Sequence, residues 1–409
     1  MNNSGGLSFS ETFNIHQLRI SDERTRKTTK NKKDIERWDK QKDRNQQKLL
    51  KSIREGRYRV SPYYIVDVML EKPRTLAILP HRDRIFQDML LRSMKTYFDK
   101  IFIKHSYACI IGRGTTQCIK DLQKVLKDDV LNTKYYIQLD IHKYFPSVDG
   151  ELLKQIIRKS IKDKKLLYYH DILIDSYKGL PIGNSTSQYY ANLFISYMLH
   201  KLLSKFNKYK IYVFVYMDDI IILCSDKKYL IEIRDFIKDE LSKLKLKLKK
   251  DNVQVYVVRK NGIRFLGFIL YGTHTLIRRN VINKCWKLVN RYCGGKIDKE
   301  TFKKSYSTYV GLFKLANTRG LCFKLYNYIY EKTGEKFYFN NWNGEVVKIS
   351  NFKNKNVRII DLTSFNRTFR IDFVYCGKSY RILSKSKKLA KTLFNKFKIR
   401  NFKSFNYTF

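Results

Sequence analysis

Two adjacent carboxylates, Asp218 and Asp219, stand between two runs of β-branched and aromatic residues in the segment Ile211–Leu223. Runs of Val, Ile, Tyr and Phe favour strands, so the segment predicts a hairpin with both acids at its tip. Burying such strands while holding two adjacent negative charges at one end is costly unless a cation neutralises the pair. Hard divalent ions such as Mg²⁺ prefer carboxylate and phosphate oxygens. The pair therefore predicts a metal site, with a solvated turn as the alternative for an Asp-Asp pair taken alone.

A second strand-like run, Tyr135–Phe145, ends its apolar half on a third acid, Asp140. If this strand lies next to the hairpin, three carboxylates meet on neighbouring strands. Such a trio is able to hold two metal ions. The sequence therefore predicts a sheet with Asp140, Asp218 and Asp219 as metal ligands.

The charge balance of the chain is strongly basic. Its 409 residues contain 83 Lys and Arg against 37 Asp and Glu, a formal net charge of +46. Such an excess strains a compact fold by self-repulsion unless a polyanion binds it, so nucleic acid is the expected partner. An AT-rich coding sequence would also raise the number of Lys residues, but it does not explain why Asp and Glu are so much fewer than Lys and Arg. The length predicts two or three domains.

The seven cysteines are scattered and include no Cys-x-x-Cys pair. Neither a zinc ribbon nor a disulfide framework is therefore indicated. The chain shows no signal peptide and no apolar run of membrane-spanning length. These features predict a reducing, cytoplasmic location and no membrane partner.

Several further segments accompany the acids in a fixed order. Tyr216-Met217-Asp218-Asp219 resembles the catalytic tetrapeptide of reverse transcriptases. The other segments resemble, in order, the finger segment, the first catalytic motif, the template and nucleotide loop, and the primer grip of bacterial members: Arg74–Arg84, Asp140–Asp149, Gly179–Gln188 with Ala191-Asn192, and Gly262–Phe268. Their joint occurrence makes the chain similar to bacterial and phage reverse transcriptases from about residue 72 to residue 268.

The resemblance implies an α+β right-hand polymerase whose palm contains an antiparallel sheet. The expected parts are a basic N-terminal extension (1–57), fingers (58–135), a palm (136–274) with a finger segment near 150–180, a helical thumb (275–335) and a small C-terminal α+β appendage (336–409). The appendage either binds RNA or a partner subunit, or packs on the thumb.

The implied activity is RNA-directed DNA synthesis. By the resemblance, two Mg²⁺ ions, with Mn²⁺ as a substitute, bind Asp140, Asp218, Asp219 and the carbonyl of Ile141. The implied partners are an RNA template or noncoding RNA, a cDNA primer–template duplex, deoxynucleoside triphosphates and an accessory protein. The location is the cytoplasm of a bacterium, with the gene carried by the bacterium or a phage.

The resemblance also assigns residues to the nucleotide and the primer. The expected nucleotide-binding residues are Lys72, Arg74, Phe145, Ile182, Gly183 and Gln188, and the expected primer grip is Phe265, Leu266 and Gly267. Lys72 and Arg74 are assigned to the triphosphate, or else are two surface cations in a basic chain. Phe145 is assigned to a steric gate that rejects a 2′-hydroxyl, or else is a core aromatic. Lys249 and Lys250 are candidates for the lysine that protonates pyrophosphate in the family.

The loop around Ile182 separates two more specific interpretations. Ile182-Gly183 followed by Ser187-Gln188 resembles the reverse transcriptases of diversity-generating retroelements, which copy an RNA template into cDNA with frequent errors opposite adenine. An apolar side chain in place of a polar amide removes a hydrogen-bonding constraint on pairing geometry, so mispairs are penalised less. The long C-terminal appendage favours instead an antiviral defence reverse transcriptase bound to its own noncoding RNA. A catalytically dead RNA-binding scaffold is the third alternative.

Local patterns give four further predictions. The first residues form a polar tail, and residues 30–44 form a charged helix with one face docked on the fingers. Asp149 caps a helix that begins at Gly150. Leu244–Lys250 alternates apolar and basic residues and predicts a strand. The C-terminal strands are expected at 336–339, 345–349, 357–362, 368–375 and 379–383, followed by a helix at 387–398.

Overall fold

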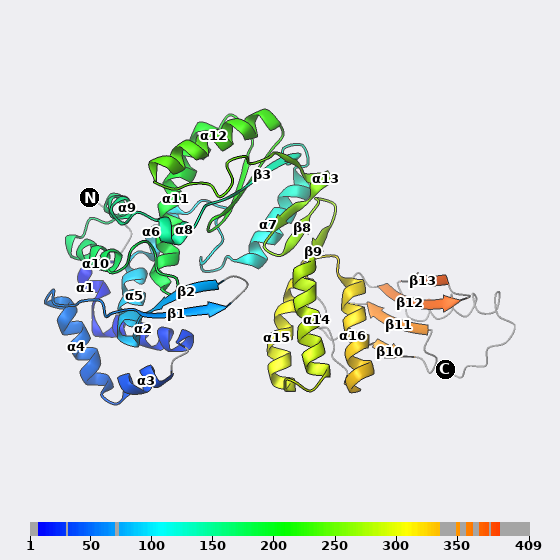
Figure 1. The fold of residues 1–409 in the computed structure, drawn as a ribbon, viewed down its shortest axis with the longest axis horizontal. Helices are drawn as coiled ribbons and strands as arrows, with labels where there is room; N and C mark the ends of the chain where they lie inside the picture. Colours follow the sequence, from blue (N-terminus) through cyan, green and yellow to red (C-terminus); the bar gives the residue numbers. More distant parts are fainter. Residues whose placement is uncertain are drawn as a thin grey trace. The chain divides into compact units, whose positions relative to one another are not determined.

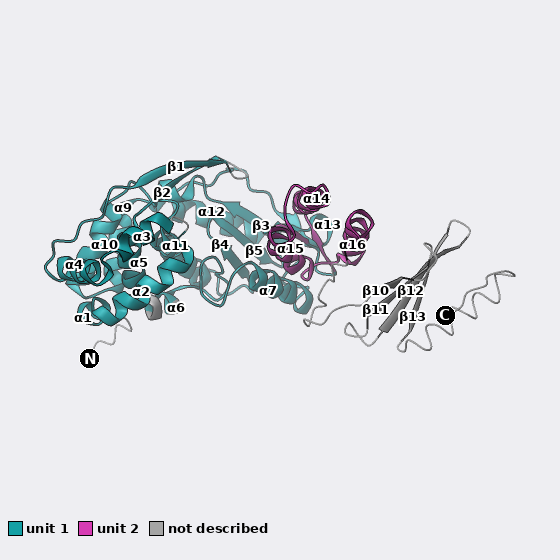
Figure 2. Cartoon of the chain, turned by 90° about the horizontal axis from the view of Figure 1, so that it is seen from below, with its two compact units in different colours: residues 1–266, 270–273 teal, residues 267–269, 274–409 magenta. Residues whose placement is uncertain are grey.

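The computed structural model describes residues 7–29, 32–69, 73–335, 349–351, 357–362, 368–375 and 378–384. The chain divides into two compact units, drawn in different colours in Figure 2. Unit 1 contains residues 1–266 and 270–273, and unit 2 contains residues 267–269 and 274–409. Across the described ranges, no helix combines the length and the apolar character needed to cross a membrane.

Four helices precede the first strand: α1 Phe9–Thr12, α2 Ile15–Thr28, α3 Lys32–Asp39 and α4 Lys42–Arg54. From residue 8 onward the predicted polar tail is wrong. Ser8 and Glu11 form a capping box that starts α1, and Phe13 and Leu18 are fully buried. The predicted charged helix corresponds to α3 and the start of α4. Its docked face is confirmed, because Trp38, Leu49, Leu50 and Ile53 are all buried in the same core.

A β-hairpin and three helices follow: β1 Tyr64–Met69, β2 Pro73–Ile78, α5 His81–Ser93, α6 Lys95–Ile101 and α7 Thr115–Asp128. β1 and β2 pair antiparallel, with Val68 opposite Arg74. Only Leu79 and Pro80 separate β2 from α5, and Pro80 immediately precedes the first turn of the helix. α5 packs against α2 and against α11 (Ser185–Lys205), so β2 is tied directly to the core of unit 1.

The central sheet has the strand order β4-β5-β3-β6 and is antiparallel throughout. Its strands are β3 Tyr135–Asp140, β4 Tyr212–Tyr216, β5 Asp219–Cys224 and β6 Tyr256–Val257. The apolar run of β5 is fully buried from Ile220 to Cys224, as its position between β4 and β3 requires. Outside β4, Ser106 forms a parallel bridge to Val215 and protects part of that edge. The predicted hairpin and first acid-bearing strand are thereby confirmed.

Helices pack around this sheet (Figure 1). α12 Lys227–Lys243 and α13 Val258–Asn261 contact the strands themselves. α8 Tyr144–Ser147 follows β3, α9 Gly150–Ser160 packs against α11, and α10 Lys164–Asp175 packs against α9 and α5. α12 packs on β3 and β5 and also against α11. The predicted cap of α9 is confirmed, because the Asp149 carboxylate accepts the Leu152 N–H at 2.9 Å.

The predicted strand at Leu244–Lys250 is wrong. The chain turns sharply at Lys245, which has φ 57°, and in this stretch only Leu248 forms a β-bridge, to Ile141. The predicted alternation of burial is present, since Leu246 and Leu248 are buried. A ladder does not form because β3 ends at Asp140 and offers a single further residue to pair with.

The chain passes from unit 1 to unit 2 through three short strands in the order β7-β8-β9: β7 Ile263–Phe265, β8 Phe268–Leu270 and β9 Thr275–Ile277. Unit 2 then forms three helices, α14 Arg279–Cys293, α15 Lys299–Phe313 and α16 Arg319–Thr333. α14 packs against both of the others, with Cys285, Phe302 and Leu325 in the shared core. Four basic residues, Arg279, Lys284, Lys287 and Arg291, belong to α14, and a fifth, Arg278, immediately precedes it.

The C-terminal part contains an antiparallel meander of four strands: β10 Ile349–Asn351, β11 Val357–Leu362, β12 Thr368–Tyr375 and β13 Lys378–Ser384. The strands predicted at 357–362 and 368–375 have the predicted bounds, and the one at 379–383 is longer by one residue at each end. Residue 349 of the strand predicted at 345–349 lies in β10. The predictions for 336–339, 345–348 and 387–398 lie outside the described residues.

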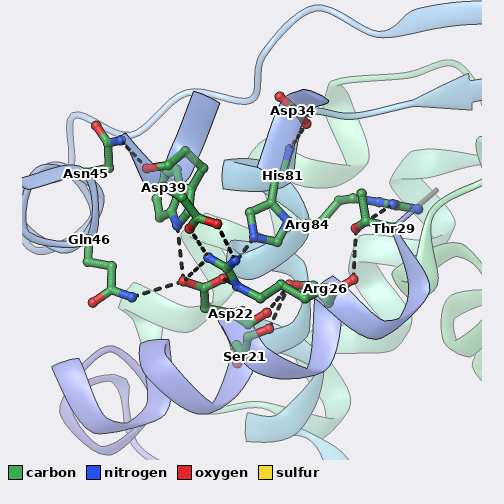
Figure 3. A network of polar contacts seen from close by, with 12 residues as sticks. Ser21, Asp22, Arg26, Thr29, Asp34, Asp39, Asn45, Gln46, His81 and Arg84 are labelled. Carbon is green, nitrogen blue, oxygen red and sulfur yellow. Dashed lines mark hydrogen bonds and ion pairs between the residues drawn. The ribbon is translucent and has the colours of Figure 1, made fainter. Parts of the chain in front are cut away.

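A buried carboxylate joins the N-terminal helices to α5 (Figure 3). The Asp22 side chain on α2 is 1% exposed and accepts hydrogen bonds from Trp38 Nε1 at 3.1 Å and Gln46 Nε2 at 3.0 Å. Its other oxygen lies 2.6 Å from Arg26 Nε and 2.9 Å from His81 Nε2. Side chains from α2, α3, α4 and α5 therefore all contact the Asp22 carboxylate or carry it.

The pKa of Asp22 shows that its partners more than compensate for its burial. Burial raises this pKa, but hydrogen bonds from His81, Arg26, Gln46 and Trp38 outweigh it and hold the pKa well below its ordinary value. A carboxyl whose pKa is lower in the folded state stabilises the fold above its unfolded pKa of about 3.9. That stabilisation is lost as the pH falls below this value.

We predict that Asp22→Asn lowers the free energy of unfolding by about 2 kcal/mol, because it presents a neutral amide to the donors of Trp38 and Gln46 and leaves Arg26 with Asp39 as its remaining counter-charge. Urea unfolding at pH 7 measures this loss. Glu55→Gln, which removes an exposed partner of Arg57, is the control and is expected to change stability by less than about 0.5 kcal/mol. Equal effects of the two substitutions would contradict the role given to Asp22.

Candidate active site

Strand pairing brings the predicted acids together in unit 1. β3 and β5 pair so that Asp140 lies opposite Asp219. β4 and β5 pair so that Tyr216 also lies opposite Asp219, which leaves Met217 and Asp218 as the two-residue turn. Asp218 and Asp219 therefore lie at the hairpin tip, as predicted, and the last residue of β3 lies beside them.

The turn between β4 and β5 is held in an unusual backbone conformation. Met217 has φ 57°, in the left-handed region, where a non-glycine residue costs about 1–3 kcal/mol. The Ile141 N–H donates to the carbonyl oxygen of Asp218 at 3.2 Å and so secures the turn. In an extended chain the N–H and C=O of one residue point to the same side, so the Ile141 carbonyl faces the turn as well. This is the side on which the predicted carbonyl ligand is needed.

The acids are electrostatically coupled. Burial raises the pKa of Asp218, and the negative charge of Asp140 adds to the rise, while Lys249 and Arg74 act in the opposite direction. The Lys249 ammonium lies 2.5 Å from the Asp140 carboxylate. This contact, together with the charges of Asp219 and Asp218, raises the pKa of Lys249. A lysine and an arginine thus act on a cluster of three acids.

The donor set fits a hard divalent cation. Carboxylate oxygens on neighbouring strands are the ligands that Mg²⁺ prefers, and the Lys249 ammonium already stands in for a cation at Asp140. In the part of the chain that the structure describes, no three His, Cys, Asp or Glu side chains converge closely enough to enclose a metal ion. Asp140 and Asp219 face each other across the strands, so an ion bound there would take further ligands from nucleotide phosphates and water.

Phe145 lies on α8, five residues after Asp140 in the sequence. It is half-buried and packs against the core of unit 1, and its ring lies 6.1 Å from that of Tyr144. The Tyr144 hydroxyl donates to the carbonyl of Ala191 on α11, and burial together with the charge of Asp218 raises the Tyr144 pKa well above its ordinary value. The Phe145 carbonyl accepts the Leu180 N–H at 2.8 Å, so α8 is joined to the predicted nucleotide loop.

That loop is also joined to β2. The Ala77 N–H donates to the Ile182 carbonyl at 2.8 Å. Gly183 has φ +124°, and a Cβ at this position would lie 2.9 Å from the Ala77 carbonyl oxygen, so the close approach requires glycine. β2 also carries Arg74, whose charge acts on Asp218. Main-chain contacts thereby join the loop at Ile182 and Gly183 to the strand that carries Arg74.

The remaining predicted residues are placed as follows. Gln188 is an exposed residue in the first turn of α11. Lys72 lies outside the described residues. Phe265 ends β7 and is buried, and Leu266 and Gly267 form the turn to β8 with φ values of 47° and 88°. Phe265 and Leu266 belong to unit 1, and Gly267 belongs to unit 2.

Two features of the site were not expected from sequence. The contact of Lys249 with Asp140 depends on a bridge between residues more than a hundred positions apart. The docking of Ile182-Gly183 on Ala77 is equally non-local. The only sequence signals were the basic alternation at 244–250 and the glycine itself, and neither names a partner.

A comparison with protein families settles the class of this fold. Residues 66–270, just over half of the 409-residue chain, match the profile of the family described as reverse transcriptase (RNA-dependent DNA polymerase). The chain belongs to the reverse transcriptase family. The resemblance inferred from the motifs and the right-hand polymerase fold are therefore confirmed at the level of the family. The bacterial and retroelement subtype stays a prediction.

Solved structures of telomerase are also similar to this reverse transcriptase. Apo telomerase from Candida tropicalis matches with a TM-score of 0.47 and 11% identity over 67% of this chain and 60% of that chain. Telomerase from Candida albicans in complex with a TWJ fragment of telomeric RNA matches with a TM-score of 0.43 and 10% identity over 67% and 56%. This chain thus spans less than two thirds of those telomerase chains. No curated protein sequence matches it.

The docking of this reverse transcriptase's loop on β2 gives a stability prediction. Gly183→Ala is expected to cost about 3 kcal/mol in the free energy of unfolding, because the new methyl group meets the Ala77 carbonyl and the backbone is strained. Gly112→Ala, at φ +77° with open space around the position, is the matched control and is expected to cost about 1 kcal/mol. Urea unfolding of both variants measures the difference. Indistinguishable unfolding midpoints would show that the loop is not seated on Ala77.

Proposed function

We propose that this reverse transcriptase copies an RNA template into DNA by two-metal nucleotidyl transfer at Asp140, Asp218 and Asp219. The observation that carries the proposal is the pairing of β3 with β5, which sets Asp140 opposite Asp219 and beside the Asp218 turn. The family match covers this region. A cluster of acids at the end of one sheet is the arrangement that two-metal phosphoryl transfer requires.

The three carboxylates and the Ile141 carbonyl would hold two Mg²⁺ ions, with Mn²⁺ as a substitute. When bound, these ions activate the primer 3′-hydroxyl and stabilise the departing pyrophosphate. The chain's own part is to fix the donors. The strained Met217 turn and the Ile141 N–H hold Asp218, and the strand pairing holds Asp140 and Asp219.

The nucleotide lies, in this proposal, between β2, α8 and the loop at 179–183. Arg74 offers a planar guanidinium to the triphosphate, and Lys72, two residues earlier in the sequence, adds a second charge. Phe145 excludes the 2′-hydroxyl of a ribonucleotide. Phe145→Ala should therefore raise the ratio of ribonucleotide to deoxynucleotide incorporation. Ile182, Gly183 and Gln188 contact the nucleotide or the templating base. The basis for these roles is the joining of α8, the loop and β2 by the Leu180 and Ala77 hydrogen bonds.

The remaining parts take the family's roles. Phe265, Leu266 and Gly267 form the primer grip, the helices α14 to α16 form the thumb, and the basic side chains of α14 follow the phosphates of the primer–template duplex. In this proposal, the division into fingers, palm, thumb and appendage keeps the bounds predicted from sequence. The site works in the cytoplasm, with RNA, deoxynucleoside triphosphates and an accessory protein as partners.

The finer proposal is a mutagenic enzyme of a diversity-generating retroelement. Its support is the half-buried Ile182, whose apolar side chain stands in the loop that is joined to both α8 and β2. A side chain without hydrogen-bonding groups cannot enforce the geometry of a correct pair as an amide does. The alternative is a defence enzyme bound to its own noncoding RNA, which the additional C-terminal sheet favours. A dead scaffold would have no use for a coupled cluster of three acids.

We predict that Asp218→Asn lowers primer extension with Mg²⁺ at least on the order of a hundredfold, because one charge of the metal site is removed. Primer extension on a defined RNA template measures this loss. Asp235→Asn, which removes a mostly exposed carboxylate on α12, is the control and is expected to retain activity. If Asp218→Asn extends primers as well as the control does, the two-metal mechanism at this site is wrong.

The finer proposal predicts the sequence of the product. Protein purified with the RNA that it retains, supplied with deoxynucleotides and Mg²⁺, should make DNA whose substitutions are concentrated at template adenines. High-throughput sequencing of the products measures this distribution. Accurate, repetitive or template-independent DNA would support the defence alternative, and no DNA from protein with all three acids intact would support the scaffold.

A further inference from the structure

The segment after α12 is held against the first acid by its backbone. The Lys249 N–H donates to the Asp140 carbonyl at 2.8 Å, and the His142 N–H donates to the Lys247 carbonyl at 2.8 Å. Between these bonds Leu248 is buried and forms a bridge to Ile141. The alternation of an extended chain then directs Lys249 away from the core that receives Leu248. The position of Lys249 is thus fixed by the chain and is not that of a freely moving surface lysine.

The Lys249 ammonium uses this position to neutralise Asp140. Its Nζ lies 2.5 Å from Asp140 Oδ2, and the two side chains are 47% and 37% exposed. The other acids of the cluster act on the same ammonium, since Asp219 and Asp218 both favour its charged form. Three carboxylates without a counter-charge would repel one another, and this repulsion is strongest where Asp218 is half-buried.

We propose that Lys249 is an internal counter-ion, which occupies the cation position at Asp140 in the metal-free enzyme and is displaced when a divalent ion binds. The proposal rests on the proposed function, because it takes Asp140 as a metal ligand. It adds a positioning role for a residue of this chain in the resting state. That role is separate from any proton transfer to pyrophosphate, because it requires neither nucleotide nor primer.

The exposure of the pair sets the expected size of the effect. An ion pair that is partly open to solvent contributes little to stability and is weakened further by salt. Lys249 therefore competes with the metal without preventing its binding. Removal of the ammonium should tighten the binding of a divalent ion by about twofold to fivefold.

The test measures Mn²⁺ binding to the full chain without nucleotide or nucleic acid, by electron paramagnetic resonance of free Mn²⁺ at 0.15 M salt. Lys249→Gln is expected to lower the Mn²⁺ dissociation constant about twofold to fivefold. Lys250→Gln is the matched control, because it removes the same charge from the next, exposed residue. It is expected to change the dissociation constant by less than Lys249→Gln does. Circular dichroism confirms that both variants are folded.

A second readout needs no metal affinity. Lys249→Gln should lower the melting temperature of the metal-free protein more than Lys250→Gln does, and saturating Mn²⁺ should abolish the difference between the two variants. The proposal is overturned if Lys249→Gln leaves the Mn²⁺ dissociation constant unchanged or raises it, or if neither variant nor wild type binds Mn²⁺. This outcome is distinct from failure of the proposed function, which would appear as undiminished primer extension by Asp218→Asn.

Discussion

The repulsion among three carboxylates at the end of one sheet is the constraint to which the rest of unit 1 is fitted. The register of β3 and β5 places Asp140 directly opposite Asp219. A slip of one residue in this register would exchange the side chains of the two buried faces of β5 and disrupt the packing on both, so the core itself holds the charges together. The hydrophobic energy of the sheet thereby offsets an electrostatic cost, which the positive charges of Lys249 and Arg74 reduce.

The loop at 179–183 is joined to α8 and to β2 by main-chain contacts. Leu180 bonds to the carbonyl of Phe145, and Ala77 bonds to the carbonyl of Ile182. Backbone contacts of this kind hold elements at a fixed separation whatever the neighbouring side chains are. The side chains of Phe145, Ile182 and Arg74 are therefore not needed to hold these elements together. Gly183, in contrast, is required because a side chain there would meet the Ala77 carbonyl.

The parts of this protein that sequence predicted are those whose signal is local. The acid hairpin, the Asp149 cap and the strands at 357–362 and 368–375 each follow from residues within one segment. Helices α1 and α2 were missed because Phe13 and Leu18 are few among polar neighbours and are buried only by partners distant in sequence. The segment 244–250 was misjudged for a related reason. Its alternation is real, but the partner strand ends where the ladder would begin. Contacts such as Lys249 with Asp140 depend on the tertiary fold and leave no local pattern to detect.

The buried network around Asp22 links the N-terminal helices to α5 and, through it, to β2. His81, which lies 2.9 Å from Asp22, is the first residue of α5, and its backbone N–H donates to Asp34 at 2.6 Å. Only Leu79 and Pro80 separate this residue from β2, the strand that receives the Ile182 loop. A rigid proline and a buried charge therefore fix the point at which β2 leaves the core. The N-terminal helices are for this reason part of the scaffold that positions Arg74.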